Sequence, residues 1–69
     1  MLIDRHISTA GHVVHIGIEQ SAIGWNVREE LDSTTIHVEH HNDWHRAERA
    51  IDRIEREVRH GIVAFTAHR

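Results

Sequence analysis

The sequence contains no cysteine, no proline and no lysine, and the absence of cysteine already limits its architecture. Without cysteine, the chain can form neither disulfide bonds nor zinc sites made of thiolates. The chain also has no low-complexity linker and no internal repeat. A sequence of 69 residues without such divisions is expected to fold as a single domain over residues 1–69.

The absence of lysine means that all eight basic residues are arginine. Biased codon usage is one explanation. The functional explanation is that a guanidinium group binds anionic groups through paired hydrogen bonds, which an ammonium group cannot do. Acidic residues number 11, so the formal net charge is −3. This acidic excess argues against strong, sequence-independent binding to nucleic acid phosphates.

Long apolar runs are also missing. No stretch approaches the ~18 apolar residues that a membrane-spanning helix needs, so no membrane partner is expected. Asp4 and Arg5 stand where a signal peptide would need an apolar run. Together with the lack of cysteine, these features favour a cytoplasmic location.

The short chain leaves little material for a core. Below roughly 70–80 residues, a single core seldom supplies more than about 3–5 kcal/mol of net stability. Disulfide bonds are excluded, so three means of support remain open. These are a second subunit, as in a homodimer, a metal ion held by histidine and carboxylate side chains, or good packing alone.

Four segments alternate between apolar and polar residues, which is typical of strands that bury one face. The clearest is residues 12–19, where Val14, Ile16 and Ile18 alternate with polar residues and glycine. The other three are residues 2–7, 23–30 and 35–40. Because the links between them are short and rich in turn-forming residues, we expect an antiparallel meander.

A helical period replaces this alternation after residue 42. Apolar residues then recur at steps of three and four, as on one face of a helix. They are Trp44, Ala47, Ile51, Ile54 and Val58. Asn42 or Asp43 can cap the first turn, and Gly61 can end the helix in a left-handed conformation. An amphipathic helix is therefore predicted from about residue 43 to residue 60.

These elements predict an α+β fold. Three or four antiparallel strands form a meander, the helix packs on one face, and residues 62–67 add a short C-terminal strand. That last strand could pair within the chain or with another subunit. The tryptophans fall on apolar faces, which favours packing in the core over a role as exposed interface anchors. The predicted core is Val14, Ile16, Ile18, Ile23, Trp25, Val27, Ile36, Val38, Trp44, Ala47, Ile51, Ile54, Val58 and Phe65.

A second stripe on the helix is basic, and it is the candidate partner-binding surface. It consists of Arg46, Arg49, Arg53, Arg56 and His60. It is offset by two residues, about 200°, from the apolar stripe, so it should face solvent on the opposite side. Such a surface could bind an acidic protein or a nucleic acid backbone. Alternatively, it is an ordinary solvated face that Glu48, Asp52 and Glu55 neutralise from the flank.

Histidine is unusually frequent, with nine residues. Protonating about nine-tenths of them, one pH unit below their ordinary pKa, would move the formal charge from −3 to about +5. On a strand, His37, Glu39 and His41 would point the same way, as a set of zinc or nickel ligands. His15 could join them from a neighbouring strand. The alternative is that these are scattered surface histidines.

Signatures of catalysis are absent. The sequence has no cysteine nucleophile, no glycine-rich phosphate loop, no Gly-x-Ser-x-Gly and no His-Glu-x-x-His. We therefore expect a small non-enzymatic module, acting as a regulator or inhibitor by binding a protein partner. Two alternatives stay open, a nucleic-acid-binding protein that uses the arginines and a metal-binding protein that uses histidine and carboxylate.

Overall fold

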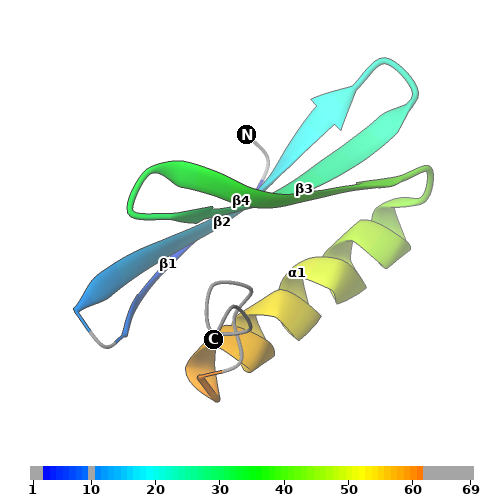
Figure 1. The fold of residues 1–69 in the computed structure, drawn as a ribbon. Coiled ribbons are helices and arrows are strands. Elements are labelled where there is room, and N and C mark those ends of the chain that lie inside the picture. Colours follow the sequence, from blue (N-terminus) through cyan, green and yellow to red (C-terminus); the bar gives the residue numbers. More distant parts are fainter. Residues whose placement is uncertain (1–2, 10, 62–69) are drawn as a thin grey trace.

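The computed structural model describes residues 3–9 and 11–61, which form four strands and one helix. The elements are β1 (Ile3–Thr9), β2 (His12–Ser21), β3 (Gly24–Leu31), β4 (Thr34–His41) and α1 (Trp44–Arg59). The strands form one antiparallel sheet in the order β1-β2-β3-β4, and α1 lies across one face of it (Figure 1). The predicted α+β meander is confirmed. The C-terminal strand predicted at residues 62–67, with Phe65, lies outside the described residues.

The core is the layer between α1 and the face of the sheet that α1 covers, called the inner face below. Its fully enclosed side chains come mainly from β2 and from the apolar stripe of α1, as the sequence predicts. The buried apolar residues are Ile7, Val14, Ile16, Ile18, Val27, Ala47, Ala50, Ile51, Ile54 and Val58. Sequence reasoning missed Ile7 and Ala50. Trp25 and Trp44 are half-buried and meet edge to face, with ring centroids 5.8 Å apart.

Local capping sets both ends of α1. The carboxylate of Asp43 accepts a hydrogen bond from the His45 backbone N–H at 3.3 Å, which satisfies one donor of the first turn. At the other end, His60 is the C-cap and Gly61 has a φ of 80°, a conformation that glycine adopts without strain. With 16 residues, α1 is short. Among the described residues, no helix is long and apolar enough to span a membrane.

Two-residue turns connect β2 to β3 and β3 to β4. Asp32 and Ser33 join β3 to β4 with φ values of 50° and 73°, the pattern of a type I′ turn. Asp32 also fixes the turn to β2, because its carboxylate accepts the Val13 backbone N–H at 2.9 Å. This bond, together with a hydrogen bond from His12, lowers the pKa of Asp32.

Ile23, Ile36 and Val38 were wrongly predicted to lie in the core. Ile23 is 76% exposed, because the two-residue turn between β2 and β3 consists of Ala22 and Ile23 themselves. Val38 is 49% exposed, and Ile36 is only half-buried.

A register shift in β4 explains the error at Ile36 and Val38. Glu30 lies opposite Thr35, whereas Glu29 lies opposite His37, so Ile36 is an extra residue in β4. A one-residue insertion of this kind turns every following side chain to the other face of the sheet. His37, Glu39 and His41 therefore face α1, and Val38 faces away from it.

Replacing Ile51 with alanine should be strongly destabilising, because its side chain is fully enclosed at the centre of the core. We expect the free energy of unfolding to fall by about 2–5 kcal/mol, measured by urea denaturation followed by circular dichroism. Ile23→Ala is a matched control at an exposed position, with an expected change within about 0.5 kcal/mol. Equal effects at the two positions would contradict the assigned core.

Ser33→Gly should stabilise the turn between β3 and β4. Ser33 has a left-handed φ of 73°, which glycine adopts readily and which costs other residues free energy. The free energy of unfolding is expected to rise by up to about 1 kcal/mol, whereas Ser33→Ala should give no gain. An unchanged or lower denaturation midpoint for Ser33→Gly would show that the turn is not strained.

Candidate functional site

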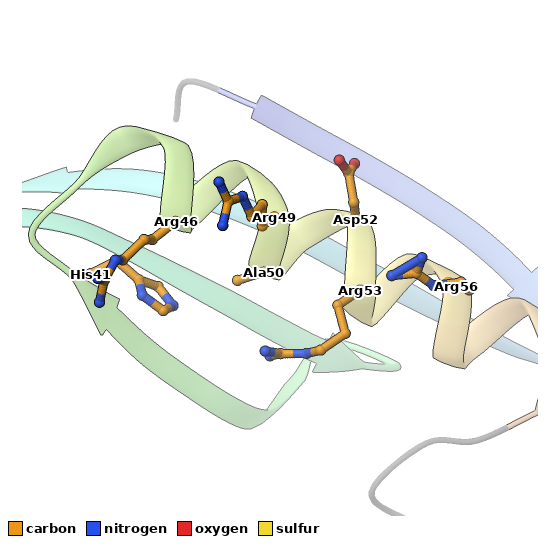
Figure 2. A pocket seen from close by; sticks show the side chains of 7 residues that line it. All are labelled: His41, Arg46, Arg49, Ala50, Asp52, Arg53 and Arg56. Atoms are coloured by element: carbon orange, nitrogen blue, oxygen red, sulfur yellow. The ribbon is translucent and has the colours of Figure 1, made fainter.

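An open cleft of about 640 Å³ runs along the flank of α1 that faces β4 (Figure 2). Its lining residues are His41, Arg46, Arg49, Ala50, Asp52, Arg53 and Arg56. Four of the five predicted partner-binding residues are therefore brought together in one concave surface. His60 does not line this cleft, because it lies beyond the last turn of α1 as the C-cap.

The arginines of this cleft differ in what they contact. A guanidinium nitrogen of Arg53 hydrogen-bonds both carboxylate oxygens of Glu39 on β4, with Oε2 at 2.7 Å. Within the described residues, Arg46, Arg49 and Arg56 have no ion pair, and all three are exposed. All four arginines are exposed, as predicted for a solvent-facing stripe, and Arg53 in addition reaches Glu39 on β4.

Glu39 is held in its charged form by these contacts. Burial raises the pKa of this carboxyl group, but the hydrogen bond and the charge of Arg53, together with His37, outweigh burial and lower it. The Arg53–Glu39 ion pair therefore links α1 to β4 beside the cleft. Arg53 is consequently less available to a ligand than the three arginines without an acidic partner.

The three acidic residues expected to neutralise the arginine stripe contact other residues, and Glu48 lies 3.6 Å from the ring of His45. Arg5 of β1 contacts Asp52 at 2.8 Å and Glu55 at 2.6 Å, from the opposite flank of α1. Arg59 also binds Glu55, at 2.9 Å. These contacts with Arg59 and Arg5 lower the pKa of Glu55, and the bond to Asp52 raises the pKa of Arg5. The lining of the cleft therefore holds four arginines and one acidic residue, Asp52, which is paired with Arg5.

A second hollow of about 410 Å³ adjoins this cleft at the turn between β4 and α1. It shares His41 and Arg46 with the cleft and is otherwise lined by His40, Asn42 and Asp43. The ring of His40 contacts Asn26 at 2.9 Å and Asn42 at 3.0 Å, which holds it against the sheet. The basic cleft thus continues into a polar hollow at its Arg46 end.

The three residues predicted as metal ligands, His37, Glu39 and His41, share the inner face of β4. Glu39 lies between the two rings, with carboxylate oxygens 3.6 Å from His37 Nε2 and 3.7 Å from His41 Nε2. Arg53 already binds the same carboxylate, so a metal ion there would have to displace a guanidinium group. His15, proposed as a fourth ligand, lies on the opposite face of the sheet, two strands away.

A different cluster brings ligand atoms closer together. Asp4, His6 and His15 each offer one such atom, and these atoms lie within 4.8 Å of one another on the face of the sheet away from α1. Sequence reasoning named only His15 of this group. The sequence nevertheless contains a signal for this cluster. Alternation places Asp4 and His6 on one face of the first strand, and pairing with the next strand brings that face beside the face that carries His15.

Glu29 is the one buried charged residue among the described part of the chain, with 6% of its surface exposed. It points towards α1, between Ile16 on one neighbouring strand and His37 on the other. Burial raises the pKa of this carboxyl group, although the nearby charge of His37 acts in the opposite direction. Sequence reasoning missed this burial, although alternation places Glu29 on the same face of its strand as Trp25 and Val27.

Glu29→Gln should stabilise the protein at neutral pH. Because the pKa is higher in the folded state, the carboxylate opposes folding above that pKa, and the penalty disappears as both states become protonated. The glutamine variant should therefore exceed the wild type in unfolding free energy at pH 7.5, with a smaller difference near pH 4.5. Denaturation curves at both pH values test this, and a loss of stability at pH 7.5 would contradict it.

Comparison with known proteins adds no assignment to this geometry. The chain shows no significant match to protein-family models, to curated proteins or to solved structures. The cleft and the two histidine clusters are the features of the described residues that could carry a function.

Proposed function

We propose that this protein is a small non-enzymatic interaction module that binds an acidic segment of a protein partner in the cleft between α1 and β4. Binding there would make it a regulator or inhibitor that acts by occupying its partner's segment. The observation that carries the proposal is the gathering of Arg46, Arg49 and Arg56 in one cleft without acidic partners among the described residues.

Charge and geometry favour carboxylates as the bound groups. Each guanidinium offers several N–H donors in a planar fork that matches the two oxygens of a carboxylate. Along α1, Arg46 and Arg49 are separated by about 4.5 Å of axis and Arg49 and Arg56 by about 10.5 Å, from the rise of 1.5 Å per residue. Alternate side chains of an extended segment are about 6.7 Å apart. Over the span of about 15 Å from Arg46 to Arg56, an extended segment with acidic residues at every second position therefore places two or three carboxylates within reach of these arginines.

The edge of the sheet favours an extended partner. Within the described residues β4 pairs only with β3, so one row of its backbone N–H and C=O groups has no strand beside it. An added peptide strand can bind such an edge through its main chain, while its side chains supply specificity. A strand placed along β4 would carry half of its side chains towards the arginines of α1.

A nucleic acid is the less suitable occupant. It could use the arginines but not the backbone of β4, and the formal charge of −3 over the whole chain opposes its approach. We further propose a cytoplasmic location, for which the absence of cysteine is the support. A second copy of the chain could also supply the added strand and form a homodimer. The experiment below distinguishes this arrangement from binding of a partner's segment.

The proposal predicts that an alternating Glu-Val peptide binds the protein, measured by fluorescence anisotropy of the labelled peptide at low salt. The same peptide with glutamine in place of glutamate should bind at least about tenfold more weakly, a difference of about 1.4 kcal/mol. Arg46→Ala with Arg49→Ala should weaken binding of the Glu-Val peptide to a similar extent, since two ion pairs of up to about 1 kcal/mol each are lost.

Arg59→Ala is the matched control, because Arg59 lies on the same helix, is exposed and contacts Glu55 on the other flank. It should change the affinity for the peptide less than twofold, about 0.4 kcal/mol. Equal binding of the glutamate and glutamine peptides would overturn the proposal. Tighter binding of a single-stranded oligonucleotide of equal length would also overturn it. So would a dimer, detected by light scattering, that does not bind the peptide and that persists in the double arginine variant.

A further inference from the structure

The face of the sheet turned away from α1, here called the outer face, carries a row of ionisable side chains across three strands. His6 of β1 lies directly opposite His15 of β2, which lies opposite Glu30 of β3. Asp4 precedes His6 by two residues and shares its face. No described element covers this face of the sheet (Figure 1). The row is therefore open to solvent and its ions.

His15 is the centre of this row. Its Nε2 atom contacts the carboxylate of Asp4, and its Nδ1 atom lies 3.2 Å from Glu30 Oε1. The residue opposite Asp4 is Gly17, which has no side chain to block the diagonal approach of Asp4 to His15. Both carboxylates thus hold the imidazole ring of His15 in one orientation, with Nε2 directed at Asp4.

His6 completes a set of three donors. Its ring stacks on that of His15 with centroids 4.4 Å apart and an angle of 17° between the planes, and its Nε2 atom lies 4.0 Å from Asp4 Oδ1. Ligand atoms bound to one zinc ion at about 2.1 Å are about 3.4 Å apart. The three donors, within 4.8 Å of one another, need only a small side-chain adjustment to reach that spacing. His6 has room for it, since 61% of its side chain is exposed.

We propose that Asp4, His6 and His15 bind one divalent transition-metal ion, with Zn²⁺ as the ion that best suits two imidazoles and a carboxylate. Glu30 is a positioning residue in this site. It accepts the Nδ1–H of His15 while Nε2 binds the metal, an arrangement found in most histidine-metal sites. Three protein ligands leave a coordination position open to water or to a group from another molecule.

Such a site would add stability that the small apolar core cannot supply alone. The ion would join β1 to β2, and Glu30 would extend the connection to β3, on the face of the sheet that receives no support from α1. Because the metal binds the folded arrangement of strands, its binding free energy adds to the stability of the fold. The site lies on the opposite face from the arginine cleft and does not depend on the proposed binding function.

The second histidine set, His37, Glu39 and His41, has a competing cation that the first set lacks. Arg53 binds the carboxylate of Glu39, whereas the carboxylate of Asp4 contacts only histidine side chains among the described residues. This difference favours the outer face for a metal ion and also provides a matched control, because two histidines can be removed from either set.

The test is isothermal titration of the metal-free full chain with ZnCl₂ at pH 7.5. We expect one ion per chain and a rise in melting temperature on addition of zinc. His6→Ala with His15→Ala should lower the affinity for zinc by more than the roughly 10–100-fold that loss of an outer-shell partner costs. His37→Ala with His41→Ala should leave the affinity within about threefold of the wild type, a factor well below that range. Glu30→Gln should weaken binding by about tenfold.

Two further measurements keep the test decisive. If circular dichroism shows that the His6/His15 variant is unfolded, His6→Ala alone replaces it, since this side chain is largely exposed. NMR signals of the His6 and His15 rings should shift on addition of zinc, and those of His37 and His41 should not. The proposal is overturned if no zinc binds, if the two double variants lose affinity equally, or if the His37/His41 variant loses more.

Discussion

The structure depends on one apolar layer between a single helix and a sheet that is wider than the helix. A helix with its side chains is about 10 Å across, whereas the outer strands of a four-stranded sheet are about 14 Å apart. The buried side chains therefore gather over β1, β2 and β3, where Ile16, Ile18 and Ile51 are fully enclosed. The inner face of β4 lies at the margin of this layer and carries His37, Glu39 and His41 instead of apolar residues.

That margin creates the cleft. Because the apolar layer stops before β4, a flank of α1 and the polar inner face of β4 border the same open space, and Arg53 spans it to reach Glu39. The opposite flank of α1 is closed by Arg5, which engages Asp52 and Glu55. One helix thus carries acids that are neutralised by Arg5 and a group of arginines, Arg46, Arg49 and Arg56, that have no acidic partner among the described residues. This asymmetry, more than the number of arginines, distinguishes the cleft from an ordinary solvated helix surface.

Much of this could be predicted from the sequence. Alternation of apolar and polar residues predicts the strands, and apolar residues at steps of three and four predict α1 and most of its buried residues. Asp43 and Gly61 predict where the helix begins and ends. Four of the five residues proposed for partner binding share one cleft, since spacing along a helix fixes which side chains lie together. Period-two alternation likewise predicts that His37, Glu39 and His41 share one face of a strand. It cannot predict which face α1 will cover, or that a cation such as Arg53 will bind the carboxylate of Glu39 in place of a metal ion.

Sequence alone therefore determined what is local in this protein: the elements, their order, the apolar stripe of α1 and the arginines beside it. Tertiary structure decided three relations between elements. A one-residue bulge turned Val38 outwards and Glu39 inwards, since strand register is set by pairing with β3. Arg5 binds Asp52 and Glu55, two of the three acids that were expected to neutralise the arginines. Pairing of β1 with β2 brought Asp4, His6 and His15 together, because contacts between strands depend on register, which no single segment encodes.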